Sequence, residues 1–269
     1  MRPLIITASI CGREKNKSDS PYFPAYKDEV VADGIKSYKH AAPQLHIHAR
    51  GDDGLFTYDA KVFGEILSSL RSQCPDAILQ ISTGGTYNKP AELLEPLLGL
   101  HPDMATFAVQ PDTAANIHLL ATFENYGVKP IVECFSLDHA ETAINLFKDG
   151  YIKAPMNLEF LYDDHRNDIP FATAAEQLLK FSKMCEPYDI NWSVCKALGN
   201  DPGIHAMAIA LGGNCRVGLE DRLTYSDGSY VKESAELVEQ IKCAAGLQGR
   251  ALANCREARN ILGINDAEQ

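Results

Sequence analysis

The chain has 269 residues, of which 45% are hydrophobic and 23% are charged, and its formal net charge is −11. This composition is typical of a globular protein and excludes a disordered one. The acidic balance argues against proteins that bind nucleic acids or anionic membranes, because both activities need a basic surface. No run approaches the roughly 20 apolar residues of a transmembrane helix. We therefore expect neither a nucleic-acid partner nor a membrane partner.

Eight cysteines are scattered along the chain without a C-x-x-C pair, and several lie inside apolar runs. In a chain long enough to bury a core of its own, this pattern favours reduced, buried cysteines over a disulfide framework. Met1-Arg2-Pro3 leads directly into an apolar run, which does not resemble a secretory signal peptide. We therefore expect a cytoplasmic protein.

Short apolar runs typical of β-strands recur along the chain, with helical patterns between them. The predicted strands are Leu4–Ile10, Leu45–Arg50, Ala77–Thr83, Met104–Val109, Lys129–Phe135, Asn157–Tyr162, Asp189–Cys195 and Cys215–Glu220. Apolar residues spaced by three and four predict a helix after Asp59. Further helices are expected to open with capping signals at Asp138 and Thr173, and a last long helix is expected from Ser234.

Eight strand–helix units in 269 residues predict one α/β domain, a (β/α)8 TIM barrel that spans residues 1–269. A doubly wound parallel sheet is the alternative fold. That fold would carry a G-x-G-x-x-G sequence after its first strand, where this chain has Cys11-Gly12-Arg13-Glu14. The barrel is therefore favoured.

Polar side chains recur at every second position of several predicted strands, and alternate side chains of a strand share one face. The second strand carries His46, His48 and Arg50 on one face, and the eighth carries Arg216 and Glu220. The same alternation places further polar residues on the corresponding face of their strands: Thr7, Ser9, Gln80, Ser82, Thr106 and Glu133. We expect these groups inside the barrel, mostly near the C-terminal strand ends, where barrel enzymes place their active sites.

The H-x-H sequence is the sharpest local signal for a metal site. Two imidazoles on one strand face can bind the same divalent ion, and a carboxylate from another strand completes an open three-ligand site. The predicted ligands are His46, His48 and Glu220, because the eighth strand closes the barrel beside the first and near the second. Such ligands favour Zn²⁺, although Mn, Fe, Co or Ni also fit them. Two hydrogen-bonded or solvent-facing histidines are the alternative.

Asp221 directly follows Glu220. Adjacent side chains of an extended chain point apart, so we expect Glu220 to bind the metal and Asp221 to act as general base at the barrel mouth. Arg216 lies one repeat below Glu220, and a buried guanidinium needs either a protein carboxylate or a substrate carboxylate as its partner. Glu14 follows the first strand and is expected over the same mouth.

The sequence Ser82-Thr83-Gly84-Gly85-Thr86 follows the third predicted strand. Its glycines allow backbone N–H groups to approach an anion, and its hydroxyls add hydrogen-bond donors. This loop is therefore a candidate for binding a substrate carboxylate. An ordinary turn rich in Ser, Thr and Gly is the alternative.

Taken together, several segments resemble the β-keto acid cleavage enzymes, of which the 3-keto-5-aminohexanoate cleavage enzyme is the best-known type. The segments are PLIITASICGRE, HIHARGDDG, LQISTGG, MAT, GVKPIVECF, GNCRVGLED and CREARNILGI. They occur in order over nearly the whole chain. The resemblance implies a zinc-dependent (β/α)8 barrel that forms a homo-oligomer, either a dimer or a tetramer. It also implies condensation of a β-keto acid with acetyl-CoA as co-substrate, which releases acetoacetate and a new acyl-CoA.

The resemblance also implies roles for individual residues by position. The zinc ligands would be His46, His48 and Glu220. Asp221 would remove the C2 proton of the keto acid, and Glu14 and Arg216 would orient that base. Glu133 would face the variable end of the substrate. The groups that hold the substrate carboxylate would be Ser82, Thr83, Gly84, Gly85 and Thr106.

Two loops depart from the family pattern, because segments 163–167 and 196–200 lack the glycine-rich sequences expected after strands six and seven. These changes bear on whether the protein uses an acyl-CoA partner. Two alternatives to the family reaction therefore stay open. One is a CoA-independent, metal-dependent lyase, aldolase or hydrolase that acts on a small keto acid. The other is a non-catalytic barrel that binds a metal or ligand. Turnover that requires acetyl-CoA would favour the family reaction over both.

Overall fold

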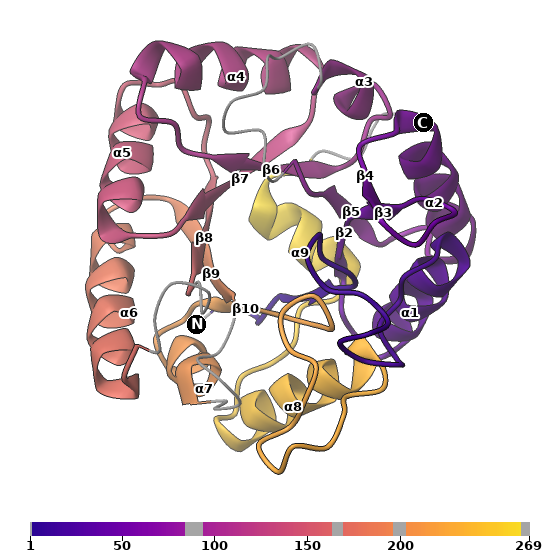
Figure 1. Ribbon diagram of the computed structural model, residues 1–269. Helices are drawn as coiled ribbons and strands as arrows, with labels where there is room; N and C mark the ends of the chain where they lie inside the picture. The colour runs from indigo at the N-terminus through magenta and orange to yellow at the C-terminus, as the bar shows by residue number, and fades with distance from the viewer. Residues whose placement is uncertain (1, 84–93, 163–168, 196–202, 265–269) are drawn as a thin grey trace.

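The computed structural model describes residues 2–83, 94–162, 169–195 and 203–264, and Figure 1 shows a ring of strands surrounded by helices. Eight parallel strands form a closed barrel in the order β1-β10-β9-β8-β7-β6-β5-β2. These strands are β1 (Ile6–Ser9), β2 (Gln44–Ile47), β5 (Ile78–Ile81), β6 (Met104–Ala108), β7 (Lys129–Cys134), β8 (Met156–Leu161), β9 (Ile190–Cys195) and β10 (Asn214–Val217). Each predicted strand overlaps one of them, although β2, β8 and β10 begin one residue earlier than predicted. The predicted (β/α)8 fold is confirmed.

Helices surround the barrel, and the last of them lies across one end of it (Figure 1). They are α1 (Lys27–Lys39), α2 (Ala60–Gln73), α3 (Glu95–Leu98), α4 (Thr113–Asn125), α5 (Leu137–Lys148), α6 (Phe171–Cys185), α7 (Gly203–Ala210), α8 (Ser234–Leu247) and α9 (Cys255–Leu262). The predicted helix after Asp59 is α2, in which Phe63 and Leu70 are buried and Asp59 accepts from the backbone N–H of Lys61 at 2.8 Å. Within the described ranges, no helix combines the length and apolar character needed to cross a bilayer.

Two predicted helix starts are wrong. The hydroxyl of Ser136 accepts from the backbone N–H of His139 at 3.2 Å and caps α5, so Asp138 lies in the first turn. Helix α6 begins directly after Pro170, which places Thr173 inside the helix. Proline lacks the N–H group that the helix interior requires, and it is tolerated at a helix start.

The second predicted strand is divided in two. Strand β2 ends at Ile47, and Ala49–Arg50 forms β3, which pairs antiparallel with β4 (Phe56–Thr57) in a separate two-stranded sheet. His48 therefore lies at the junction between the barrel strand and this hairpin. The rings of Phe56 and His48 meet edge to face, with centroids 5.6 Å apart, and this contact restricts the orientation of His48.

Arg50 was expected inside the barrel, and this prediction is wrong because the strand ends before it. Its buried guanidinium donates to the carbonyl oxygens of Gly12, Lys15 and Gly54, the last two at 2.6 and 3.0 Å. The guanidinium carbon also lies 4.8 Å from the centre of the Phe23 ring. Arg50 thus fixes the loop after β1, which carries Glu14.

Helix α9 closes the barrel at the N-terminal ends of the strands (Figure 1). Its buried Ala258 and Leu262 belong to one apolar cluster with Ile5, Ile78, Met104 and Ile131. Polar side chains inside the barrel are hydrogen-bonded to one another, as Gln44 accepts from Thr7 at 3.0 Å and donates to Gln80 at 2.7 Å. The candidate site lies toward the opposite end of the barrel.

Candidate metal centre and active site

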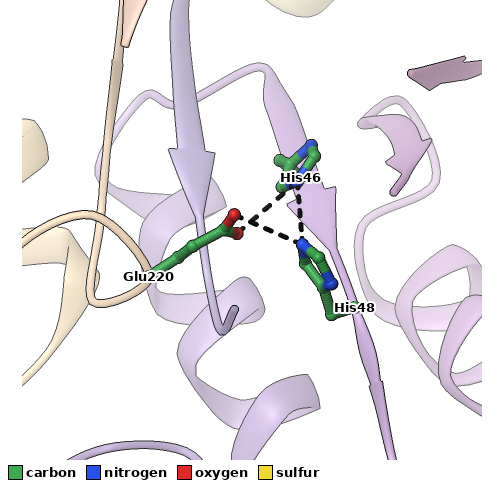
Figure 2. A group of neighbouring side chains, drawn as sticks. All are labelled: His46, His48 and Glu220. Carbon is green, nitrogen blue, oxygen red and sulfur yellow. Dashed lines mark hydrogen bonds and ion pairs between the residues drawn. The ribbon is translucent and has the colours of Figure 1, made fainter. Parts of the chain in front are cut away.

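His46, His48 and Glu220 converge where β2 and β10 end, and Figure 2 shows their side chains facing one another. Nε2 of His48 lies 3.2 Å from Oε1 of Glu220, and Nε2 of His46 lies 3.5 Å from Oε2. The two Nε2 atoms are 3.3 Å apart. Four ligands placed tetrahedrally at about 2.0–2.1 Å from a zinc ion are separated by about 3.4 Å. The spacing of the two imidazole nitrogens and the carboxylate oxygens therefore fits such an ion.

The protonation of these groups also fits a metal site. Burial and the charge of Arg216 lower the pKa of His46 to about 4, so its imidazole is neutral at pH 7 and has a lone pair to donate. Burial alone would raise the pKa of Glu220, but Arg216 and the two histidines hold it well below its usual range. Glu220 Oε2 is buried without a hydrogen-bond partner among the described residues. A divalent ion would satisfy this carboxylate oxygen.

Close packing of the turn after β10 against β1 brings Glu220 to the histidines. A Cβ atom added to Gly218 would overlap the backbone of Ser9. A Cβ atom on Gly12 would lie 2.7 Å from Cγ of Glu220. Only glycine leaves room for these approaches, so both positions shape the site directly.

Asp221 and Glu220 were expected to point apart, and this prediction is wrong. The residues after β10 form a turn, in which the N–H groups of Asp221 and Arg222 donate to the carbonyl oxygen of Gly218 at 3.0 and 2.9 Å. Both carboxylates consequently face Arg216, whose Nη2 lies 2.5 Å from Oε1 of Glu220 and 3.1 Å from Oδ1 of Asp221. The alternation of an extended strand does not continue into this turn.

Three side chains donate to the carboxylate of Asp221, which is 8% exposed. The Ser9 hydroxyl donates to Oδ2, the Cys195 thiol donates to Oδ1 at 3.4 Å, and Nε of Arg216 donates to Oδ2 at 3.4 Å. Burial raises the pKa of Cys195 well above its ordinary value, so this group is a thiol. These donors hold the carboxylate in one orientation, which a general base requires.

Glu159 on β8 is the site carboxylate that sequence analysis missed. Its Oε2 accepts from Nη1 of Arg216 at 2.9 Å, and its Oε1 accepts from the Ser193 hydroxyl at 3.1 Å. Burial raises the pKa of Glu159 above its ordinary value, although the adjacent Arg216 opposes the shift. Leu158 and Phe160 on either side pack outward into the core, so the same period-two pattern could have placed Glu159 inside the barrel.

The predicted carboxylate-binding loop begins at the end of β5. Ser82 and Thr83 are both buried there. The N–H of Thr83 donates to Oγ1 of Thr106 at 2.9 Å, and its hydroxyl donates to the carbonyl oxygen of Thr106 at 2.6 Å. These bonds fix the start of the loop against β6. Gly84 and Gly85 lie outside the described residues, as do segments 163–167 and 196–200.

Glu14 lies in the loop after β1, with 58% of its side chain exposed. Its Oε1 atom is 3.7 Å from Nη2 of Arg13. Arg216, the other residue expected to orient the base, does contact Asp221. The role of Glu14 toward Asp221 remains a prediction.

Glu133 on β7 pairs in register with Glu159 on β8, and both lie inside the barrel. Glu133 is 6% exposed, and no hydrogen bond or ion pair joins it to another residue in the described ranges. Burial, followed by the charge of Glu159, raises the pKa of Glu133 to about 8. At neutral pH this carboxyl group is therefore mostly protonated.

We expect Glu133→Gln to stabilise the metal-free protein against thermal unfolding at about pH 8 and to have little effect near pH 4. The pKa of Glu133 is about 8 in the folded state. In the unfolded chain a glutamate has a pKa of about 4.3. The wild type therefore loses stability as pH rises between these values, and a glutamine does not. Thermal melts across this range should show a growing Tm difference. A difference independent of pH would contradict the raised pKa.

The family model described as beta-keto acid cleavage enzyme matches residues 3–264. A 3-keto-5-aminohexanoate cleavage enzyme of Acetoanaerobium sticklandii is 34% identical over 277 residues, which cover 98% of this chain and 100% of that protein. One from Fusobacterium nucleatum is 33% identical over 276 residues, 98% of this chain and 99% of that protein.

A more distant relative is the 3-oxoadipate:acetyl-CoA acetyltransferase of Cupriavidus necator. It is 28% identical over 280 residues, 99% of this chain and 97% of that protein. Among solved structures, a ternary complex of ObcA with a C4-CoA adduct and oxalate has a TM-score of 0.77 at 17% identity, covering 91% of this chain and 68% of that chain. This structural likeness supports the fold alone. With the family match over nearly its whole length, the chain belongs to the β-keto acid cleavage enzyme family.

Proposed function

We propose that this protein condenses a β-keto acid with acetyl-CoA and releases acetoacetate and a new acyl-CoA. The observation that carries the proposal is the grouping of a His-His-Glu metal site with the Asp221 carboxylate around one buried arginine, in a chain of this family. The relative from Cupriavidus necator carries acetyl-CoA in its name, which supports acetyl-CoA as co-substrate. The family resemblance also leads us to expect a homo-oligomer, which light scattering of the purified protein checks.

The proposed metal is Zn²⁺, because two imidazoles and one carboxylate form a ligand set of catalytic zinc centres. Held by His46, His48 and Glu220, the ion would act as a Lewis acid toward the keto oxygen of the substrate. Asp221 removes a proton from C2 of the keto acid. Arg216 and Ser9 donate to the oxygens of Asp221 and so hold its carboxylate in place for this transfer.

The bonds of the reaction balance without a further reactant. After proton removal by Asp221, C2 of the keto acid attacks the acetyl carbonyl carbon, and the CoA thiolate leaves. The thiolate then attacks C3 of the condensed product, and the original C2–C3 bond breaks. The new acyl-CoA leaves from C3, and C2 recovers a proton from Asp221 to give acetoacetate.

The loop after β5 is proposed to hold the carboxylate of the keto acid. Ser82 lies at its start, and the hydrogen bonds between Thr83 and Thr106 fix the backbone there. Gly84 and Gly85, which follow in the sequence, would let backbone N–H groups approach the carboxylate.

The proposed substrate class is a β-keto acid with a cationic amino group on its variable part. Two relatives at 33% and 34% identity are named 3-keto-5-aminohexanoate cleavage enzymes. Glu133 is a buried carboxyl without a cation partner among the described residues. A substrate ammonium group would supply the missing counter-charge and favour the ionised form of Glu133.

We expect Glu133→Gln to lower kcat/KM for 3-keto-5-aminohexanoate by about 10–100-fold, because the variant loses a charge-assisted hydrogen bond. The effect on 3-ketohexanoate, which lacks the amino group, should be much smaller. Steady-state kinetics with both substrates measure the difference. An equal loss for both substrates would contradict recognition of the amino group by Glu133.

The proposed function is tested with a panel of β-keto acids and zinc-loaded protein, with and without acetyl-CoA. Mass spectrometry should detect acetoacetate and the matching acyl-CoA only when acetyl-CoA is present. Cleavage without acetyl-CoA would instead support a lyase, and metal binding without turnover would support a non-catalytic barrel.

A further inference from the structure

Arg216 connects three carboxylates, and the proposed reaction uses only two of them. Its Nη2 atom contacts Glu220 and Asp221, and Nε also donates to Asp221. Its Nη1 atom donates to Glu159 at 2.9 Å. Glu159 is neither a predicted metal ligand nor a predicted base, so its contact with Arg216 needs an explanation of its own.

Glu159 is the most deeply buried of the three carboxylates that contact Arg216. Its side chain is 0% exposed, against 15% for Glu220 and 8% for Asp221. Glu220 and Asp221 are therefore partly accessible from solvent, whereas Glu159 is not. A group so placed acts on the reaction through Arg216 rather than by touching the substrate.

Three neighbouring barrel strands hold the Glu159 carboxylate in place. Glu159 on β8 is in register with Ser193 on β9, which donates to it, and Cys195 on β9 is in register with Arg216 on β10. Side chains supported by strands in this way are held more precisely than side chains on loops. By contrast, Glu220 and Asp221 lie in the turn after β10.

A guanidinium is planar, and its donors form a fixed fork. When Nη1 is held by Glu159, the remaining edge of the Arg216 group is aimed at Asp221 and Glu220. A carboxylate accepts more strongly from a guanidinium than a neutral amide does, so a neutral acceptor at position 159 would hold Nη1 less firmly. Without any acceptor there, Nη1 would be a buried donor that lacks its partner, and the guanidinium would be free to turn toward other acceptors.

We propose that Glu159 is a positioning residue, which fixes the Arg216 guanidinium in the orientation that aligns Asp221 with the C2 proton of the substrate. This inference rests on the proposed function and deepens it. Proton removal then depends on a carboxylate that does not itself contact the substrate.

The test compares Glu159→Met and Glu159→Gln with the wild type. Methionine keeps the length of the side chain but removes both oxygens, whereas glutamine keeps one acceptor oxygen and loses the charge. Hydrogen–deuterium exchange at C2 of a β-keto acid in D2O, without acetyl-CoA, isolates the step assigned to Asp221. Steady-state kcat and KM, zinc content and Tm are measured on the same preparations.

Asp33→Asn is the matched control, because Asp33 is a buried carboxyl group on α1 that accepts from the backbone N–H of Ser234 at 3.0 Å. This control lies outside the barrel interior. It removes a buried charge and should change Tm while leaving the C2 exchange rate per zinc-loaded chain at the wild-type value.

In Glu159→Met we expect C2 exchange and kcat to fall about 10–100-fold, as for other groups that support reacting residues, with KM and zinc content within about twofold of wild type. Glu159→Gln should lose less, and it decides the question alone if the methionine variant does not fold. Wild-type exchange in the folded Glu159 variants would overturn the positioning role only. Absence of exchange in the wild type would overturn the proposed function as well.

Discussion

Asp221→Asn is expected to retain zinc and to lower kcat by about 10²–10⁴-fold, the usual contribution of a general base. An amide cannot accept the C2 proton, although it has nearly the shape of the carboxylate and can keep part of the hydrogen bonding to Ser9 and Arg216. The measurement is kcat on protein with its zinc content quantified. C2 exchange in D2O should fall by the same factor.

Asp227→Asn is a suitable control for this experiment. Asp227 is an acid in the loop between β10 and α8, and it accepts from the backbone N–H of Ser229 at 2.9 Å. Its removal tests whether loss of another negative charge from the segment between β10 and α8 lowers the rate. Near-normal kcat in zinc-loaded Asp221→Asn would show that another group removes the proton.

Removal of a metal ligand should have a comparably large effect. Wild-type protein is expected to bind about one zinc ion per chain, and both His46→Ala and Glu220→Gln should lose most of this metal together with turnover. The three ligand atoms lie within 4.8 Å of one another and would hold the ion together. Loss of one of them leaves only two protein ligands for the ion. Elemental analysis after gel filtration measures the metal content.

His40→Ala provides the control for ligand removal. His40 also forms a histidine–glutamate contact, with Nδ1 2.7 Å from Oε1 of Glu239, but this pair is exposed on the outer surface. Its removal should leave metal content unchanged. Wild-type metal occupancy in His46→Ala or Glu220→Gln would exclude these residues as the ligands.

The parts of the site that follow from strand periodicity could be predicted from the sequence. In β2 and β10, a repeat of two determines which side chains enter the barrel, so His46, Arg216 and their neighbours could be assigned to its interior. Closure of the barrel then brings the first, second and last strands together. Glu220 could be joined to the histidines on that basis, although it lies 172 positions from His48.

The errors occur where strand geometry ends. Alternation was extended from β2 to Arg50, but the chain leaves the barrel after Ile47 to form the β3–β4 hairpin. It was also extended from β10 to Asp221, but Gly218 lets the chain turn closely against β1. Glu159 was missed for another reason. The period-two pattern of β8 assigns it to the barrel interior, but only closure of the barrel brings it to Arg216, two strands away.

In the proposed reaction the acetyl group of acetyl-CoA ends in acetoacetate, and isotope tracing tests this most directly. Zinc-loaded protein is given an unlabelled β-keto acid and acetyl-CoA carrying ¹³C at both acetyl carbons, and products are analysed by mass spectrometry. We predict that both labels appear in acetoacetate, at C3 and C4, and that the new acyl-CoA is unlabelled. Cleavage of the keto acid with all label remaining in acetyl-CoA or appearing in acetate would contradict the proposed condensation.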